Sequence, residues 1–475
     1  MRRTKIIATL GPSVASAEAI SDLVGAGMDV ARLNFSHGNH ETKTILAGWV
    51  RDAAAKNGRN VAILQDIQGP KLRVGSFPGG SVSLEKNSII RLVPGDGAGS
   101  SEVLPLAYKY LLDDVVPGEM ILLADGLIRL QVEERLSDSL SARVVVGGLL
   151  SDNKGVAFPE TVLRVPSITE KDREDLEFGK DLGVDYVAAS FVRSASDVEQ
   201  VSALAGGTPV IAKIELAIAY ENLHEILGTA YGAMVARGDL GVQMELQKLP
   251  LVQRDILSRT NAAGRISITA TEMLESMTSS PRPTRAEVTD VANAVLSGTD
   301  AVMLSGETAV GDYPIAAVDY MDRICREAES GLDVDDAVDF LTSHRTFASA
   351  IAKASVEVAD NLNLRTVVAF TETGSTALLL SKYRPRARII AFTPEPATRR
   401  RMALFWGVDA IPFERRDVTD LMIASAEKYL EKSGLCEPGE GVVMVAGIPP
   451  NEEASTNLMK IHTIGERARG VRPPR

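Results

Sequence analysis

The sequence lacks the cysteine patterns that mark disulfide-rich and zinc-binding proteins. Its 475 residues include only two cysteines, Cys325 and Cys436, which lie far apart. Neither a disulfide framework nor a zinc site built on paired cysteines is therefore expected. The sequence also contains no internal repeats and no low-complexity tracts.

A concentration of positive charge is missing as well. The chain has 51 Lys and Arg against 63 Asp and Glu, a net charge of −12, and no basic block. This balance argues against nucleic acid or a membrane surface as the main partner. An acidic protein that handles phosphates must instead gather its cations locally.

Long hydrophobic runs are absent too. No window approaches the 18 uninterrupted apolar residues of a transmembrane helix. The amino terminus, MRRTKIIATLGPS, begins with two arginines, but Thr9 and Gly11-Pro12 interrupt its apolar run and no cleavage-like site follows. We therefore expect no signal peptide and a cytoplasmic protein.

What remains is the composition of an ordinary globular protein, arranged as alternating strands and helices. A hydrophobic content of 45% over 475 residues predicts two to four domains. Short apolar runs alternate with amphipathic stretches, which indicates βαβ units and a parallel sheet. The expected strands are Ile6–Leu10, Val30–Leu33 and Val61–Leu64, then Tyr186–Ala189, Pro209–Ile214, Gly232–Ala236, Ile266–Ala270 and Ala301–Leu304. Eight strands predict a closed (β/α)8 barrel, whose carboxyl-terminal face carries the chemistry.

Two further domains are predicted around this barrel, which takes residues 1–73 and 165–340. Residues 74–164 show short alternating runs separated by Gly and Pro, as in an inserted small β-barrel domain. We expect this domain to close over the barrel as a lid. Residues 341–475 resume the strand and helix alternation and predict an open α/β domain, with the acidic segment Asp333–Asp339 as its connection.

The stretch from Val210 to Leu240 delivers charge at the ends of two predicted strands. Lys213 and Glu215 are two residues apart, so on a strand they point the same way. Arg237 and Asp239 follow the next strand. Two carboxylates beside a lysine and an arginine fit a divalent cation and an anionic substrate. From spacing alone, ordinary solvated strand ends remain an equal alternative.

Motifs along most of residues 1–330 resemble the pyruvate kinase family. They are ATLGP (8–12), ARLNFSHG (31–38), QGPKLRVG (68–75), KIE (213–215), AYENLHEI (219–226), MVARGDLGV (234–242), ITATEMLESM (268–277) and RPTRAEVTDVANAVLSGTDAVMLSGETAVGDYP (282–314). The resemblance implies transfer of the phosphoryl group of phosphoenolpyruvate to ADP, which gives pyruvate and ATP. Such a reaction depends mainly on positioning and on neutralising negative charge.

The same resemblance implies roles for individual residues. Glu215 and Asp239 match the divalent-metal ligands, for Mg²⁺ or Mn²⁺, and Lys213 matches the lysine at the phosphoryl group. Arg32, Gly238 and Thr271 match groups that bind the substrate. For the nucleotide the matching residues are Arg73, His37, Asn34 and Lys154, with His37 expected on the adenine ring.

A departure from the family's usual pattern concerns potassium. Asn34, Ser36 and Asp66 match the pocket for a monovalent cation, but Lys71 stands where many members have glutamate and Ile67 where they have threonine. A lysine there supplies the positive charge itself, so we expect turnover without K⁺. The alternative is that Lys71 only pairs with Asp66 or Glu307. Gln243 and Glu272 also depart from the usual pattern.

The carboxyl-terminal domain contains a loop that resembles the family's effector site. Its residues Thr371, Thr373, Gly374, Ser375 and Thr376 follow a predicted strand and precede a helix, an arrangement that binds anions. The loop 447–453 is acidic and offers no side chain to grip a second phosphate. We therefore expect AMP or a sugar monophosphate as the effector, acting across a homotetramer.

Two other functions compete with this interpretation. Another barrel enzyme acting on pyruvate enolate, such as an aldolase or lyase with one metal, needs the carboxylates but not Arg73 or the inserted domain. The other is a metabolite-sensing protein that keeps the effector domain but has lost catalysis. The intact residues Lys213, Glu215, Asp239, Arg32 and Thr271 argue against it.

Overall fold

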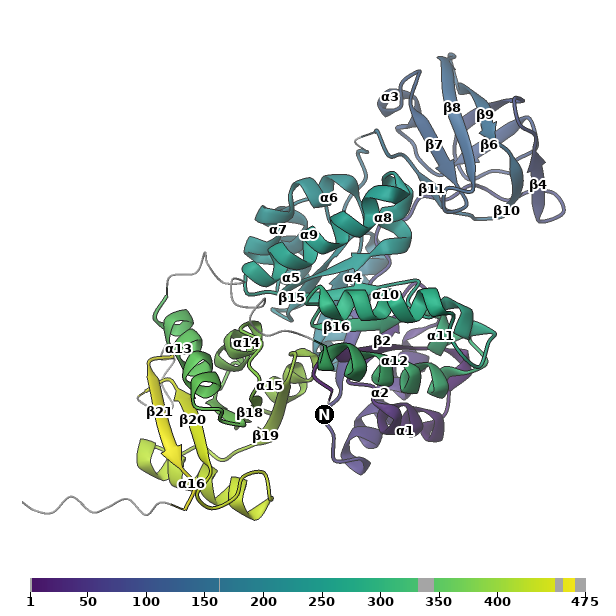
Figure 1. Ribbon diagram of the computed structural model, residues 1–475. Helices are drawn as coiled ribbons and strands as arrows, with labels where there is room; N and C mark the ends of the chain where they lie inside the picture. Colours follow the sequence, from purple (N-terminus) through teal and green to yellow (C-terminus); the bar gives the residue numbers. More distant parts are fainter. Residues whose placement is uncertain (1, 162, 332–345, 449–455, 466–475) are drawn as a thin grey trace, which may run out of the picture.

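The computed structural model describes residues 2–161, 163–331, 346–448 and 456–465. Three parts follow one another across Figure 1: a strand-rich part at one end, a barrel surrounded by helices in the middle, and a mixed part at the other end. The amino terminus lies between the barrel and the last part. The expected connection Asp333–Asp339 lies outside the described residues, and so do the end of the acidic loop 447–453 and residues 466–475.

The middle part is a closed barrel of parallel strands in the order β1-β16-β15-β14-β13-β12-β3-β2. All eight predicted strands are confirmed, with ends shifted by at most two residues. The strands are β1 (Lys5–Leu10), β2 (Val30–Asn34), β3 (Ala62–Asp66), β12 (Tyr186–Ala189), β13 (Val210–Ile214), β14 (Gly232–Ala236), β15 (Ile266–Ala270) and β16 (Ala301–Leu304). Their sequences are mostly apolar because both faces of each strand are buried.

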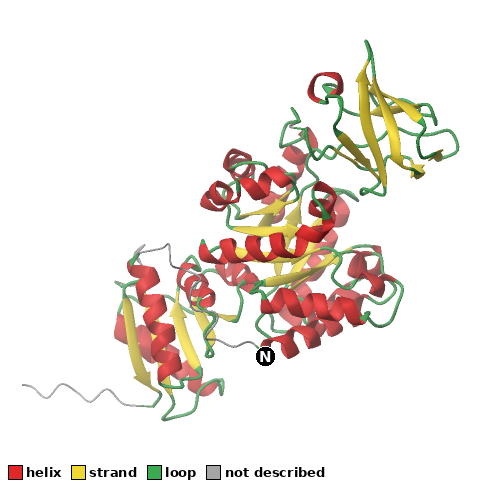
Figure 2. Cartoon of the chain, turned by 45° about the horizontal axis from the view of Figure 1, so that its top comes forward, coloured by secondary structure: helices red, strands yellow, loops and turns green. Residues whose placement is uncertain are grey.

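A ring of helices packs around the strands (Figure 2). Its members include α1 (Ala17–Ala26), α2 (His40–Lys56), α4 (Glu170–Leu182), α5 (Ala195–Leu204), α7 (Leu223–Thr229), α9 (Leu249–Ala262), α10 (Arg285–Leu296) and α12 (Pro314–Ser330). Short helices α6 (Ala217–Glu221), α8 (Arg237–Gln243) and α11 (Gly306–Ala309) start just after strands. Thr169 is the N-cap of α4, and it forms a capping box with Asp172.

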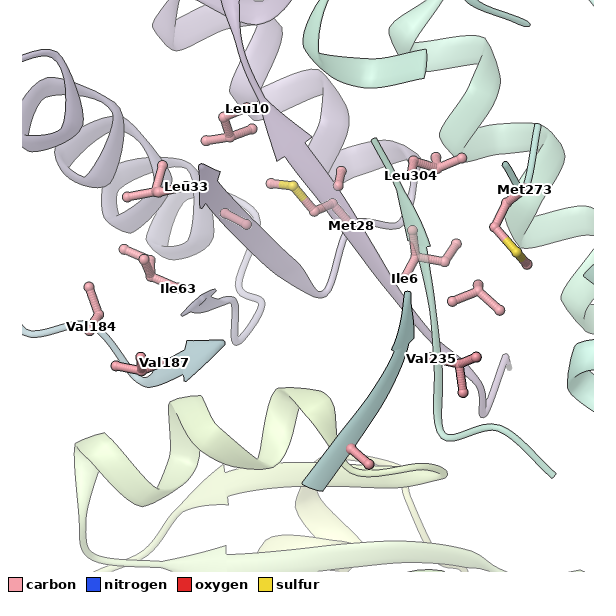
Figure 3. Packing of buried hydrophobic residues seen from close by; sticks show 14 of the residues in the cluster. Ile6, Leu10, Met28, Leu33, Ile63, Val184, Val187, Val235, Met273 and Leu304 are labelled. Carbon is pink, nitrogen blue, oxygen red and sulfur yellow. The ribbon is translucent and has the colours of Figure 1, made fainter. Parts of the chain in front are cut away.

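Alternation along each strand sorts its side chains between two layers. Ile6 and Leu10 of β1 belong to the cluster between strands and helices, which Figure 3 shows, whereas Ile7 belongs to the cluster inside the barrel. On β13, Ile214 packs on the helix side and Ile211 on the inner side. Because side chains repeat every two residues, Lys213 points inward with Ile211, at the carboxyl end of the barrel.

The inserted part contains a curled six-stranded sheet, β11-β7-β8-β9-β5-β6, and a two-stranded sheet, β10-β4. The alternating runs expected in this part form the strands β5 (Ile89–Pro94), β7 (Met120–Leu123), β8 (Ile128–Arg135) and β9 (Leu140–Val146). Four short strands and one helix were not predicted: β4 (Ser81–Leu84), β6 (Val103–Leu106), β10 (Gly148–Ser151), β11 (Val156–Ala157) and α3 (Leu111–Asp114). Each has at most four residues, too few for a period to show.

The carboxyl-terminal part is a five-stranded sheet with helices on both faces (Figures 1 and 2). Its strand order is β19-β18-β17-β20-β21, and only β21 runs antiparallel. The elements are α13 (Phe347–Asn361), β17 (Thr366–Phe370), α14 (Ser375–Lys382), β18 (Arg388–Thr393), α15 (Pro396–Arg401), β19 (Val408–Pro412), α16 (Thr419–Lys432), β20 (Gly441–Ala446) and β21 (Leu458–Thr463). The strand and helix alternation expected for this part is confirmed. Within the described ranges, no helix is long and apolar enough to cross a membrane.

Buried ion pairs fasten this carboxyl-terminal part to the amino-terminal end of the barrel. Asp300, just before β16, pairs with Lys382 and Arg384, and all three side chains are buried. Asp185, just before β12, pairs with Arg400 at 2.8 Å. The catalytic end of the barrel is therefore left free to face the inserted part.

Candidate active site

A buried lysine lies at the centre of the carboxyl end of the barrel. Lys213 Nζ is 2.7 Å from Glu215 Oε1 and 3.3 Å from Asp66 Oδ1, and it donates a 2.8 Å hydrogen bond to Ser190 Oγ. Burial alone would lower the pKa of Lys213, but the carboxylates of Asp66 and Glu215 outweigh it and raise the pKa well above its usual value. The lysine therefore carries a fixed positive charge.

Asp66 joins this lysine to an arginine from a neighbouring strand. Arg32 on β2 donates from Nε to Asp66 Oδ2 at 2.7 Å and from Nη1 to Thr9 Oγ1 at 2.9 Å. Burial would raise the pKa of Asp66, but Lys213 and Arg32 lower it below its usual value. Strands β2, β3 and β13 thus hold two cations and one carboxylate in fixed positions around the barrel mouth.

Glu215 and Asp239 place two further carboxylates beside this cluster. Burial raises the pKa of Glu215, and the charge of Asp239 raises it further, while Lys213 opposes the shift. Glu215 Oε2 also accepts a 2.7 Å hydrogen bond from the Phe191 backbone N–H. Asp239, in the first turn of α8, is more than a third exposed. The two acids repel each other, and a cation between them would relieve that repulsion.

Gly238 and Thr271 form a second edge of the site. The Gly238 N–H donates a 2.9 Å hydrogen bond to Thr271 Oγ1, whose hydroxyl donates to the Ala270 carbonyl at 2.8 Å. Thr271 has a positive φ of 61°, an uncommon conformation for a β-branched residue. Arg237 holds this conformation, since its guanidinium donates to the Thr271 carbonyl and pairs with Asp290.

Lys71 contacts a different carboxylate from the two expected. Its Nζ lies 3.7 Å from Asp239 Oδ1, whereas Asp66 pairs with Arg32 and Lys213. Glu307 is buried and accepts hydrogen bonds from the Ser305 and Leu274 backbone N–H groups. The alternative in which Lys71 pairs with Asp66 or Glu307 is therefore not what the structure shows.

A cleft of about 590 Å³ opens between the barrel and the inserted part. Lys71, Glu215 and Asp239 line it from the barrel side, and Asp125 and Gly155 line it from the inserted part. Figure 1 shows the inserted part standing off this end of the barrel. A ligand in the cleft would therefore touch both parts.

The residues expected at the nucleotide do not line this cleft, although Lys71 and Leu72 before Arg73, and Gly155 after Lys154, do. Arg73 donates to the Asn153 carbonyl of the inserted part at 2.8 Å. His37 and Lys154 are exposed, and Asn34 Oδ1 accepts a 3.0 Å hydrogen bond from the Ser36 backbone N–H. Sequence reasoning gave no role to Ser190, whose hydroxyl donates to the Ile67 carbonyl while it accepts from Lys213. The only signal was its place in the polar cluster after β12.

Comparison with known proteins identifies the family. The sequence model described as pyruvate kinase, barrel domain, matches residues 1–318, and the one described as pyruvate kinase, alpha/beta domain, matches residues 349–462. The chain belongs to the pyruvate kinase family. It is similar to the pyruvate kinase of Geobacillus stearothermophilus, with 44% identity over 98% of this chain and 81% of that one. For the pyruvate kinase of Sporosarcina psychrophila the identity is 42%, over 99% and 82%.

A solved structure gives the same result. The crystal structure of a pyruvate kinase from Cryptosporidium parvum superposes with a TM-score of 0.92 and 36% sequence identity, covering 98% of this chain and 96% of that one. The barrel, the curled sheet and the separate α/β part are thus the pyruvate kinase fold. As a member of this family the chain is a phosphotransferase that requires a divalent metal.

The loop that resembles the family's effector site is closed by its own hydrogen bonds. Thr371 Oγ1 accepts from the Gly374 N–H at 2.9 Å, and Thr376 Oγ1 lies 2.8 Å from Thr456 Oγ1. Gly374 has a φ of 93°, and a Cβ on it would come within 3.3 Å of the Phe405 ring. Only Thr373 and Ser375 present exposed hydroxyls. These two side chains, with the first N–H groups of α14, are the groups left for an anion.

Proposed function

We propose that phosphoryl transfer from phosphoenolpyruvate to ADP takes place at the barrel mouth, where Glu215 and Asp239 border the cleft between the barrel and the inserted part. The observation that carries this assignment is the position of Lys213, a buried ammonium held between Glu215 and Asp66 at the barrel mouth. In a chain of this family, such a cation is available to the phosphoryl group in transit. The products are pyruvate and ATP.

Lys213 and Arg32 act on charge that moves during the reaction. The phosphoryl oxygens carry negative charge throughout transfer, and the enolate oxygen gains it when the phosphorus–oxygen bond breaks. A compact ammonium at Lys213 stabilises both, and the planar guanidinium of Arg32 grips the phosphoryl oxygens. Their pairing with Asp66 fixes both cations before substrate arrives, so little reorganisation is needed.

Glu215 and Asp239 are the residues that would hold the divalent metal. Carboxylate oxygens suit Mg²⁺ or Mn²⁺, and Mg²⁺ keeps several positions for water and substrate oxygens. Burial raises the pKa of Glu215 and the charge of Asp239 adds to that rise, so a bound cation between the two carboxylates would be favoured. The metal supplies charge neutralisation at the substrate oxygens. Two protein carboxylates suffice for this, so the lack of a larger acidic cluster among the described residues is no obstacle.

The remaining residues position the two substrates. The glycine at 238 keeps the start of α8 open to the substrate carboxylate, beside the Thr271 hydroxyl. Arg73, His37 and Asn34 hold the nucleotide from the barrel rim, and Lys154 approaches when the inserted part closes. Closure would exclude water from the transfer. Arg73 supports this arrangement, since it already contacts the inserted part.

The metal assignment is tested with Asp239→Asn. We expect kcat/KM to fall by about 100-fold or more, because the substitution removes a metal ligand that stabilises the transition state. The folded structure should be unaffected. The control is Asp319→Asn, which removes an exposed carboxylate on α12 that pairs with Arg323. A lactate dehydrogenase-coupled assay measures turnover, and circular dichroism checks the fold. Near-normal activity of Asp239→Asn would refute the assignment.

Independence from potassium is a second part of the proposal. Asp66 already pairs with Arg32 and Lys213. The pocket that Asp66 forms with Asn34 and Ser36 therefore has little negative charge left to bind a monovalent cation. Lys71 adds positive charge nearby, and two unit charges ~4 Å apart repel by roughly 4 kcal/mol at an effective dielectric of ~20.

Assays in tetramethylammonium buffer at constant Mg²⁺ test this. The unmodified enzyme should turn over without K⁺, whereas Lys71→Glu should acquire a K⁺ requirement in the binding of phosphoenolpyruvate and ADP. Lys248→Glu makes the same charge change at an exposed position and should behave as the unmodified enzyme. An unmodified enzyme that is inactive until K⁺ is added would contradict the role of Lys71.

The third part concerns regulation by a phosphorylated metabolite. Thr373 and Ser375 would bind its phosphate at the start of α14, and the acids Glu372 and Glu395, joined through Arg415, disfavour a second phosphate nearby. We therefore favour AMP or a sugar monophosphate over a sugar bisphosphate, acting across a homotetramer. Activation by a bisphosphate alone would overturn the preference, and sedimentation measures the assembly.

A further inference from the structure

A second cleft, of about 800 Å³, lies where the amino-terminal end of the barrel meets the carboxyl-terminal sheet. One wall is the start of the chain, residues 2–5 before and at the start of β1. The other wall is formed by the amino ends of β17, β18 and β20 and the turns that precede them. None of the residues assigned to catalysis or to the effector loop lines it.

Positive charge is concentrated in this cleft. Its lining contains six cationic and three acidic side chains in a chain whose net charge is −12. The cations are Arg2, Arg3, Lys5, Arg365, Arg386 and Arg388, and the acids are Asp409, Glu437 and Glu440. An excess of cations inside a concave, low-dielectric surface attracts anions.

Two of these cations are fully used by the fold. Arg2 pairs with Asp29 and Asp322, both at 2.8 Å. Arg3 donates to the carbonyls of Pro385 and Arg386 and lies over the Trp406 ring. They build the wall and bring the barrel and the sheet together, but they have little capacity left for a ligand.

Lys5 is the cation with the least compensation. It is 7% exposed, and its ammonium has a single hydrogen-bond acceptor within the described part of the chain, the Val408 carbonyl at 3.0 Å. Burial lowers the pKa of Lys5, and the charges of Asp29 and Asp409 do not restore it. A buried ammonium without a carboxylate in contact is costly unless an anion completes its environment.

Two arginines at the edge of the sheet extend this site toward solvent. Arg388 lines the cleft, where it donates from Nη2 to the Leu435 carbonyl and from Nε to Thr366 Oγ1 at 3.5 Å. Arg365 is exposed and forms no ion pair with a residue that the structure describes. With Lys5 inside and two guanidinium forks at the rim, the donors match an anion with several oxygens.

We propose that this cleft binds a phosphorylated small molecule. Its volume is within the usual range for ligand sites, and a cleft of this size encloses a metabolite rather than a macromolecule. Phosphate fits the donors better than a single carboxylate does, because it presents three terminal oxygens and up to two charges. The ligand would contact the first residues of the barrel and the carboxyl-terminal sheet together.

This site is distinct from the effector loop. β17 begins at Thr366, which lines the cleft, and ends at Phe370, one residue before the loop. The two regions therefore lie at opposite ends of the same strand, roughly 15 Å apart at about 3.3 Å per residue. Variants can remove one without touching the other.

The test measures binding of pyrophosphate and of glycerol 3-phosphate to the full chain by calorimetry, without divalent metal. Arg365→Glu, at an exposed position, should weaken binding at least tenfold, and Lys5→Met should weaken it similarly. Arg323→Glu makes the same charge change on exposed α12 and should leave binding intact. Thermal unfolding checks that each variant folds. If Lys5→Met does not fold, Arg365→Glu alone decides the test.

Two further variants separate this cleft from the other anion sites. Binding should persist in the double variant Thr373→Ala, Ser375→Ala and in Arg32→Gln. Loss of binding in either, or unchanged binding in Arg365→Glu, would assign the anion elsewhere and overturn the proposal. Failure of both probes to bind the unmodified chain would overturn it as well.

Discussion

Replacing Asp300 by asparagine should destabilise the joint between barrel and carboxyl-terminal part by about 3–5 kcal/mol. Asp300 is 1% exposed, pairs with Lys382 and with Arg384 at 2.8 Å, and accepts a 2.7 Å hydrogen bond from the Ser267 N–H. The asparagine retains the shape but leaves two buried cations without a counter-charge. Removing one partner of a buried ion pair costs far more than the pair contributes, because the remaining charge is desolvated.

Lys382→Met is the matched comparison. It removes one cation but leaves Asp300 paired with Arg384, so its cost should be much smaller. Burial would raise the pKa of Asp300, yet Lys382 and Arg384 lower it below its usual value. A lowered carboxyl pKa gives stability that is present above the unfolded value and lost on acidification. The difference between Asp300→Asn and the unmodified chain should therefore shrink below about pH 4.

The assay uses the tryptophan next to this joint. Arg384 lies over the Trp406 ring at 4.5 Å, and the chain has only one other tryptophan, Trp49. In a Trp49→Phe background, Trp406 is the remaining tryptophan. Its fluorescence during urea unfolding then reports on the joint, even where the three parts do not unfold in a single transition. A loss below about 1 kcal/mol for Asp300→Asn, or equal losses for both variants, would refute the reasoning.

Three further predictions concern single positions. Gly238→Ala should fold normally, because its Cβ would meet only Thr271 atoms at 3.7 Å or more, yet it should raise the KM for phosphoenolpyruvate. Gly11→Ala should lower the melting temperature, since its Cβ would lie 2.4 Å from the Ala309 carbonyl oxygen; an unchanged value would contradict this. Burial lowers the pKa of Lys382 to about 8. Between pH 8 and 10 the unfolded chain therefore binds more protons at Lys382 than the folded chain does, so the free energy of unfolding should rise with pH relative to Lys382→Met. Parallel curves of unfolding free energy against pH for the two proteins would disprove this.

The barrel was predictable from sequence because its strands are buried on both faces. Runs such as Gly232–Ala236 and Ile266–Ala270 are buried throughout, and charged residues follow each within two positions. The prediction that Lys213 and Glu215 point the same way followed from their spacing of two, and their side chains lie 2.7 Å apart. Local pattern was enough wherever the partners lie on one strand.

Contacts between distant segments could not be read in this way. Lys71 lies against Asp239 because of how the chain enters the inserted part, and no periodic pattern encodes that approach. Lys382 and Asp300 are 82 residues apart and meet only because two folded parts dock. Strands β4, β6, β10 and β11 were missed because isolated runs of two to four residues carry no period.

The strand β1 has a consequence for the thermodynamics of the whole chain. Its first residue, Lys5, lines the basic cleft, and near its other end Thr9 Oγ1 accepts from Arg32 at the barrel mouth. Six residues of extended backbone connect the two places without a hinge. Linkage is reciprocal: by whatever factor an anion at Lys5 changes the affinity for substrate, substrate must change the affinity for that anion by the same factor. Saturating the enzyme with phosphoenolpyruvate would then change the measured affinity of the basic cleft for its anion, at the opposite end of the barrel.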